Sequence, residues 1–319
     1  MWSLYALILG FCLDLIVGDP HWMPHPIVFI GKLIDLTEKA MRKVFPKTVR
    51  GENVAGAAIW LIVVTVSAGI PLLILYVAYD FNCWLGLLLE TIMCAQILAT
   101  KSLRQESMKV YQALQTGDLE KARHTVSMIV GRDTQRLDEA GVARAAVETV
   151  AENTSDGIIA PMLFLAIGGA PLGFFYKAVN TMDSMLGYVE MPYKNVGLVP
   201  AKLDDFFNWL PARISALLML CAGAFLGMDW KNGWRIYRRD RHNHSSPNAA
   251  QTESVCAGLL GLRLAGDAWY HGVLHKKKYI GDPVREIEPE DIPRACKLLY
   301  TTAFFGLVVF AGVKILTLL

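Results

Sequence analysis

The sequence predicts an all-α, polytopic integral membrane protein with about five transmembrane helices, one broken or re-entrant segment and helical cytoplasmic loops. Of its 319 residues, 54% are hydrophobic and only 19% are charged, whereas an average soluble domain is about 45–50% apolar with about a quarter of its residues charged. The apolar residues also fall into long charge-free runs. The formal net charge of +2, from 31 basic and 29 acidic residues, argues against a nucleic-acid-binding protein.

A transmembrane helix needs about 20 apolar residues, because the bilayer offers its backbone no other hydrogen-bond partners. Five segments meet or approach this length, at residues 1–17, 54–79, 82–99, 214–228 and 298–319. The first lacks the basic start and the cleavage site of a signal peptide, so we expect a retained helix. We treat residues 1–319 as a single membrane domain with polar loops at 18–52, 101–156, 177–209 and 229–297.

Residues 157–176 form a sixth apolar segment that differs from the others. It has no charge, but it contains Pro161, Pro171 and four glycines, two of them adjacent at Gly168 and Gly169. This composition favours a broken or re-entrant helix beside a protein-lined cavity over a plain transmembrane helix.

The distribution of basic residues predicts the orientation of the chain in the membrane. Six lie in residues 18–52, eight in 101–156 and twelve in 229–297. We therefore expect a multi-pass protein of the cytoplasmic (inner) membrane with most polar loops in the cytoplasm. The side of the membrane on which residues 177–209 lie stays open.

A helix is predicted to begin at about Asp138, which is placed to cap it. Arg144, Glu148, Glu152 and Asp156 then recur every four residues, so consecutive members share one face. Three carboxylates on one face could hold Mg²⁺ through one or two direct ligands and water. The alternative is a solvated face with i,i+4 ion pairs, although Arg144 before Glu148 is the weaker order for such a pair.

Residues 176–213 contain a second set of polar side chains. It comprises Lys177, Asn180, Asp183 and Tyr188, followed by Asp204, Asp205, Asn208 and Arg213. Adjacent aspartates before a membrane entry are costly unless they are paired or bind a metal, and an interfacial helix cap is the equally open alternative. Arg213 either extends toward the membrane surface or clamps a phosphate or carboxylate.

Two further polar stretches are of interest. Prolines at positions 20, 24 and 26 exclude a helical metal pair of His21 and His25, and leave a rigid turn that presents Asp19 and His25. A basic run at residues 235–241 is typical of a topology signal or of contact with anionic lipids. Residues 249–266 are apolar yet contain Glu253 and Arg263, and they are predicted to form a helix packed on the domain.

Ordered motifs across most of the chain resemble one family. They include GDP at 18–20, PHP at 24–26, GRDT at 131–134, RAAVETVAENTSDG at 144–157, KAVNTMDSM at 177–185, NWLPAR at 208–213 and SPN at 246–248. These motifs are similar to those of the adenosylcobinamide-phosphate synthase (CbiB/CobD) family. The resemblance implies a membrane enzyme of late cobalamin biosynthesis that joins adenosylcobyric acid, a corrinoid, to (R)-1-amino-2-propanol phosphate or a related amino-alcohol phosphate.

The resemblance also implies ATP as a co-substrate and Mg²⁺ as a cofactor, with an acyl phosphate as the plausible intermediate, and it leaves room for other late cobalamin-pathway enzymes as partners. The expected metal ligands are Glu148, Glu152, Asp156, Asp183 and Asp205. The expected catalytic residues are Asp19, His25, Glu148, Glu152, Lys177 and Arg213. The expected binding residues are Arg132, Arg144, Asn153, Asn180, Tyr188, Asn208 and Asn248. The alternative is a membrane regulator or scaffold of the distantly similar AmpE type, without ligase activity.

Overall fold

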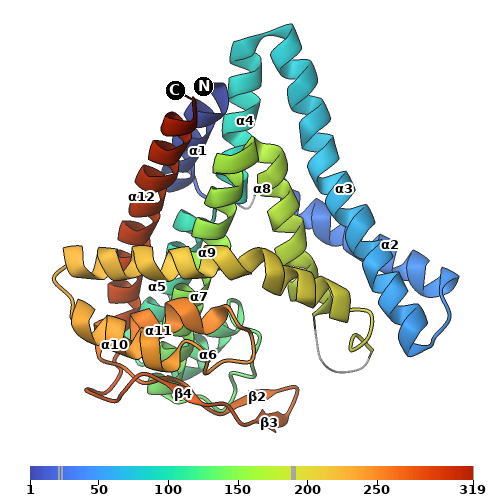
Figure 1. The fold of residues 1–319 in the computed structure, drawn as a ribbon. Helices are drawn as coiled ribbons and strands as arrows, with labels where there is room; N and C mark the ends of the chain where they lie inside the picture. Colours follow the sequence, from blue (N-terminus) through green and yellow to red (C-terminus); the bar gives the residue numbers. More distant parts are fainter. Residues whose placement is uncertain (21, 23, 188–191, 319) are drawn as a thin grey trace. The chain divides into compact units, whose positions relative to one another are not determined.

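The computed structural model describes residues 1–319 except 21, 23, 188–191 and 319, and the described residues form twelve α-helices, one π-helical turn and four short strands (Figure 1). The all-α prediction is confirmed. The chain groups into two compact units. The first unit comprises residues 1–99, 160–208 and 309–319, and the second comprises 100–159 and 209–308. The expectation of a single domain stays a prediction.

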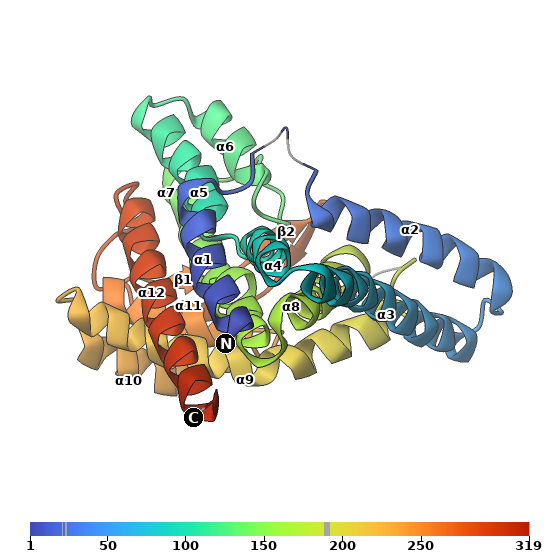
Figure 2. The same cartoon turned by 90° about the horizontal axis from the view of Figure 1, so that it is seen from above.

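The first unit is a set of long apolar helices. It contains α1 (Trp2–Ile16), α2 (Pro26–Val44), α3 (Val49–Phe81), α4 (Cys83–Ile97) and α8 (Ala160–Leu186). Asn82 joins α3 to α4 and caps α4, because its side-chain oxygen accepts the backbone N–H of Trp84 at 2.8 Å. Figure 1 shows the tight turn between these two helices, and Figure 2 shows α2 running alongside α3.

The adjacent glycines break α8. Gly168 and Gly169 have non-helical backbone angles, and Gly169 has a φ of +64°, which favours glycine. The ribbon of α8 turns back at this point (Figure 1). The buried carboxylate of Glu90 lies beside the turn, where it accepts the backbone N–H of Ala170 at 3.4 Å and the hydroxyl of Tyr79 at 2.6 Å. The prediction of a broken segment is confirmed.

Replacing Gly169 by alanine is expected to lower the free energy of unfolding by about 2 kcal/mol or more, because a side chain at positive φ is strained. An alanine Cβ would also lie 2.3 Å from Oε1 of Glu90. The matched control is Gly69→Ala in α3, where no atom lies within 4 Å of the new Cβ. Thermal unfolding in detergent tests this prediction, and equal unfolding midpoints for the two variants would contradict it.

The second unit combines shorter helices with two small sheets. Its helical elements are α5 (Thr100–Gln115), α6 (Leu119–Ser127), α7 (Glu139–Thr154), the π-helical turn η1 (Ser155–Ile159), α10 (Trp230–Asp240) and α11 (Ala249–Leu260). Its strands are β1 (Leu264–Ala265), β2 (Ala268–Tyr270), β3 (Val273–His275) and β4 (Tyr279–Ile280). β1 pairs antiparallel with β4, and β2 with β3.

Helix α7 is central to the second unit, since it packs against α5, α6 and α11. Asp138 caps it as predicted, with its side chain accepting the backbone N–H of Gly141 at 2.7 Å. All twelve residues of α11 are buried, which confirms the prediction of a packed helix as far as Leu260. The predicted continuation to residue 266 was wrong, because Gly261 ends the helix in a left-handed conformation and residues 264–265 form β1.

Among the residues that the structure describes, five helical stretches are long and apolar enough to cross a membrane. They are Val49–Phe81, Cys83–Gln115, Glu139–Leu186, Leu198–Phe225 (helix α9) and Asp291–Thr317 within α12 (Asp291–Leu318). Four of the five expected segments lie in or overlap these stretches. The exception is the N-terminal segment, because α1 has only 15 residues. The sixth predicted segment, the broken one at residues 157–176, lies within the stretch Glu139–Leu186.

Candidate functional site

A polar cavity of about 210 Å³ lies within the second unit. It is lined by Ile129, Val130, Gly131, Arg132, Glu148, Thr149, Glu152, Asn153, His244, Glu253, Tyr270 and Lys277. We call it the Glu152 cavity. The structure thus brings together four of the predicted site residues, Arg132, Glu148, Glu152 and Asn153, on α7 and on the loop before it. The helical spacing that predicted Glu148 and Glu152 on one face is confirmed.

Glu148 holds Arg132 in place at this cavity. One carboxylate oxygen accepts a hydrogen bond from Arg132, and the other accepts the backbone N–H of Ala265 at 2.6 Å. Burial works against the charge of Arg132, but Glu148 outweighs it and raises the pKa of the guanidinium, which stays protonated. Because both oxygens of Glu148 are engaged, its geometry suits a positioning residue better than an open metal ligand.

Glu253 is an acidic residue of this cavity that was not among the predicted site residues. It lies on buried α11, and its Oε2 atom has no hydrogen-bond partner among the residues that the structure describes. Burial, followed by the nearby carboxylates of Glu152 and Glu148, raises the pKa of Glu253 well above its usual value. The available signal was one acidic residue in an otherwise uncharged helix, since an unpaired buried carboxyl is costly.

Three more residues of the cavity come from loops and strands and were also missed. The Nδ1 atom of His244 accepts the backbone N–H of Ser246 at 3.1 Å. Burial, with the positive charge of Lys277, lowers the pKa of His244 to about 4, so the ring is neutral at neutral pH. The Lys277 ammonium donates to the Tyr270 hydroxyl at 2.7 Å and lies 4.6 Å from the centre of that ring.

The cavity therefore combines cations with acids in a small volume. Within the described part of the chain, no three His, Cys, Asp or Glu side chains form a ready-made metal site. Mg²⁺ usually binds through one or two carboxylates with water and substrate phosphate, and it does not require such a cage.

The other predicted residues of the second unit lie outside the described lining of this cavity. These are Arg144, Asp156, Arg213 and Asn248. Asp156 falls in η1, where the wider π-helical turn ends the four-residue spacing. The guanidinium of Arg213 lies 4.2 Å from the ring centre of Trp209, donates to the Trp209 carbonyl at 2.6 Å and approaches Asn248 at 3.4 Å.

The first unit gathers the second predicted polar set. Lys177, Asn180 and Asp183 lie on α8, and Asp204, Asp205 and Asn208 lie on the first turns of α9. The Asn208 amide donates to Asp204 at 3.0 Å and accepts the Tyr176 hydroxyl at 2.7 Å. Asp204 also interacts electrostatically with Asp183 and Asp205. The first unit thus holds a second acidic cluster, built from two helices.

The N-terminal turn engages both ring nitrogens of His25. Nε2 lies 3.2 Å from Asp19, and Nδ1 accepts the backbone N–H of Ile27 at 3.2 Å and so caps α2. Because both ring nitrogens are engaged in these local contacts, the geometry favours a structural role for His25. The predicted binding residue Tyr188 lies outside the described residues.

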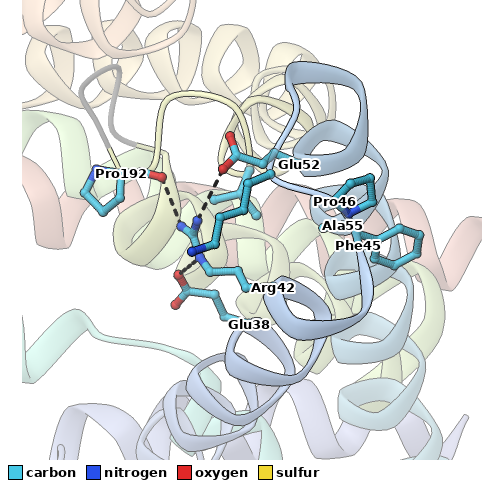
Figure 3. A pocket seen from close by; sticks show the side chains of 9 residues that line it. Glu38, Arg42, Phe45, Pro46, Glu52, Ala55 and Pro192 are labelled. Carbon is cyan, nitrogen blue, oxygen red and sulfur yellow. Dashed lines mark hydrogen bonds and ion pairs between the residues drawn. The ribbon is translucent and has the colours of Figure 1, made fainter.

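A separate cavity of about 390 Å³ lies between α2 and α3 in the first unit (Figure 3). Arg42 donates to Glu38 at 2.7 Å and to the Pro192 carbonyl at 3.0 Å, and it lies 3.8 Å from Glu52. The charged groups that meet at Arg42 are thus already paired with one another, and this cavity is a weaker candidate for chemistry than the Glu152 cavity.

Comparison with known proteins gives a consistent result. The family model described as CobD/CbiB protein matches residues 7–299. A "Cobalamin biosynthesis protein CobD" of Clostridium perfringens is 48% identical over 303 residues, which cover 95% of each chain. The protein of that name in Klebsiella pneumoniae is 44% identical over 98% of each chain. A "Cobalamin biosynthesis protein CbiB" of Salmonella typhi is 42% identical over 98% of each chain. No solved structure matches. With a family match over nearly its whole length and relatives this similar, the chain belongs to the CobD/CbiB family.

Proposed function

We propose that the protein is a membrane enzyme of late cobalamin biosynthesis. In this proposal it joins the propionate carboxylate of adenosylcobyric acid to (R)-1-amino-2-propanol phosphate, or a related amino-alcohol phosphate, at the expense of ATP. The names of the near full-length relatives support the pathway. The observation that carries the chemistry is the Glu152 cavity, where a basic pair and an acidic pair face the same small volume. An amide ligation brings anionic phosphates and a cationic amine together, so its site needs basic side chains for the phosphates and acidic side chains for the amine.

The basic side of the cavity suits phosphate. Arg132 is charged and oriented by Glu148, so its guanidinium can bind phosphate oxygens without rearranging. Lys277 adds a second positive charge from the strand side of the cavity. In our proposal these two cations stabilise the charge that develops when the substrate carboxylate attacks the terminal phosphorus of ATP and ADP leaves.

The acidic side suits a cation. Glu152 and Glu253 supply hard carboxylate oxygens, and the Oε2 atom of Glu253 is buried without a partner in the described structure. These residues fit Mg²⁺, which when bound would neutralise phosphate charge. Glu152 is also the carboxylate that we assign to the amine. It would take the proton of the ammonium group, and the free amine nitrogen then attacks the acyl carbon while phosphate leaves.

The experiment that tests this proposal measures adenosylcobinamide phosphate by mass spectrometry, using the purified protein in detergent with and without ATP and Mg²⁺. Glu152→Ala is expected to reduce product formation about 100-fold or more while expression in the membrane is retained. The matched control is Glu139→Ala, an exposed glutamate on the first turn of the same helix. Undiminished product formation by Glu152→Ala would remove the proposed role, and substrate binding without ATP consumption by the wild type would favour a binding or scaffold protein.

A further inference from the structure

Helix α10 has a buried face and a basic face. Its buried residues include Gly233, Ile236 and Tyr237. The opposite face exposes basic side chains together with tryptophan, and no acidic residue lies between Trp230 and Arg239. A shallow hollow of about 430 Å³ on this face is lined by Lys231, Trp234, Arg235, Arg238 and Arg239. The lining is therefore basic and aromatic throughout.

The position of α10 places this face near the end of a membrane helix. Only residues 226–229 separate α10 from the C-terminal end of α9, which is long and apolar enough to cross a membrane. The two helices also pack closely, since a Cβ on Gly233 would lie 3.1 Å from Cδ1 of Leu220 in α9. Since α9 has the length and composition of a membrane-crossing helix and α10 follows its C-terminal end after four residues, we infer that α10 lies near the level of the lipid headgroups.

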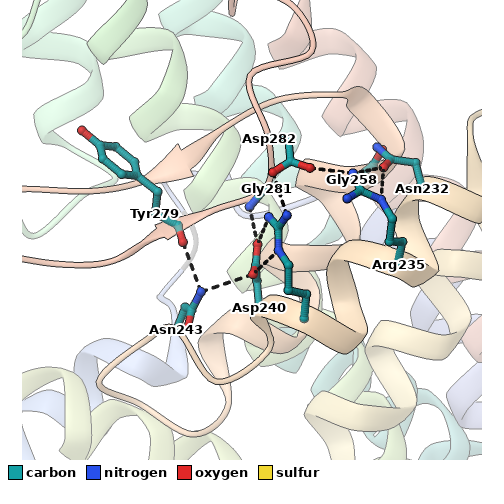
Figure 4. A network of polar contacts seen from close by, with 9 residues as sticks. Asn232, Arg235, Asp240, Asn243, Gly258, Tyr279, Gly281 and Asp282 are labelled. Atoms are coloured by element: carbon teal, nitrogen blue, oxygen red, sulfur yellow. Dashed lines mark hydrogen bonds and ion pairs between the residues drawn. The ribbon is translucent and has the colours of Figure 1, made fainter.

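The basic residues of this face differ in their partners. Arg235 and Arg239 are paired with Asp282, at 2.6 and 2.8 Å, and Figure 4 shows Arg235 and Asp282 in this network. Lys231 and Arg238 form no ion pair within the described ranges of the chain. Two cations are therefore available to a ligand, while the arginines beside them are held in place.

The exposed indoles indicate which anion fits. Trp230 and Trp234 are 48% and 39% exposed, and their four-residue spacing places them on one side of the helix. Two exposed indole rings would make no favourable contact with a small soluble phosphate, which is bound by charge and hydrogen bonds. Tryptophan is instead enriched at the membrane interface, where one part of the ring is apolar and the N–H is hydrated.

We propose that the basic face of α10 binds the headgroups of anionic phospholipids in the leaflet at the C-terminal end of α9. Lys231 and Arg238 contact the lipid phosphates, and Trp230 and Trp234 lie among the headgroups. This surface lies outside the residues lining the Glu152 cavity, and the proposal does not depend on the proposed reaction.

The test uses the full-length protein in detergent and measures bound lipid by native mass spectrometry. Short-chain phosphatidylglycerol and phosphatidylcholine are the two probes. The wild type is expected to prefer phosphatidylglycerol, and the double variant Lys231→Gln with Arg238→Gln to bind it about 25-fold more weakly, at about fivefold for each basic residue. The matched control removes the same charge from the exposed Lys276 and Lys278 by glutamine substitution, and it is expected to bind like the wild type.

Three results would overturn the proposal. They are equal binding of the two lipids by the wild type, unchanged phosphatidylglycerol binding by the double variant, or an equal loss in the control. A further measurement adds glycerol phosphate as a competitor to the bound lipid. Displacement of the lipid at equal concentration would identify a site for a free phosphate and would also overturn the proposal. Because the substituted side chains are exposed, both variants are expected to keep the thermal unfolding midpoint of the wild type.

Discussion

Replacing Glu148 by alanine is expected to abolish measurable ligation and to lower the free energy of unfolding by about 3 kcal/mol or more. The substitution leaves the partly buried charge of Arg132 and the backbone N–H of Ala265 without their acceptor. Removing one partner of such a pair costs about 3–5 kcal/mol, because the remaining charge is uncompensated. Arg132 also loses its orientation, and loss of one aligned donor to a developing charge reduces the rate about 10²–10³-fold.

A double-mutant cycle separates the two effects. Adding Arg132→Ala to Glu148→Ala removes the uncompensated charge, so it is expected to restore part of the lost stability but none of the activity. Stability can be followed by thermal unfolding of the purified protein in detergent. If the single variant Glu148→Ala were as stable and as active as the wild type, Glu148 would not be the residue that positions Arg132.

Local sequence patterns predicted the parts of the structure that depend on short-range regularity. The apolar runs predicted most of the membrane helices, and the spacing of Glu148 and Glu152 predicted their common face. The adjacent Gly168 and Gly169 predicted the break in α8. Each of these features follows from helix length, helix period or the backbone freedom of glycine, all of which can be read within about 20 residues.

The rest of the candidate site depends on contacts between distant parts of the chain. His244, Glu253 and Lys277 reach the Glu152 cavity from segments about a hundred residues beyond α7, and nothing in a single sequence specifies that approach. Asp156 does not join Glu148 and Glu152 in the described lining of this cavity, and the local backbone differs there. A π-helical turn begins at Ser155, and the four-residue spacing carries no sign of the switch in backbone hydrogen bonding.

Replacing Glu253 by glutamine is expected to reduce ligation about 100-fold and, at the same time, to stabilise the protein at neutral pH. Glutamine keeps the size of the side chain, but it cannot carry the negative charge that a bound cation requires. Wild-type Glu253 is buried beside two other carboxylates, and its Oε2 atom has no partner in the described structure. A residue that opposes folding and is nevertheless present is expected to serve the site.

The pH dependence of stability shows whether Glu253→Gln stabilises the protein by removing a buried ionisable group or only by changing the side-chain packing. In EDTA, the raised pKa of Glu253 means that the folded protein keeps a proton that the unfolded chain releases above its ordinary pKa of 4.5. The contribution of this group therefore favours folding at low pH and is lost as the pH rises, by up to about 1.4 kcal/mol per pH unit until the raised pKa is reached.

Glu253→Gln removes this dependence of stability on pH, so the difference in unfolding midpoint between variant and wild type should grow from pH 5 to pH 8. Titration of His244 affects both proteins and cancels in that difference. A difference that does not change with pH would mean that Glu253 titrates normally, and the cation-binding role would then lose its physical basis.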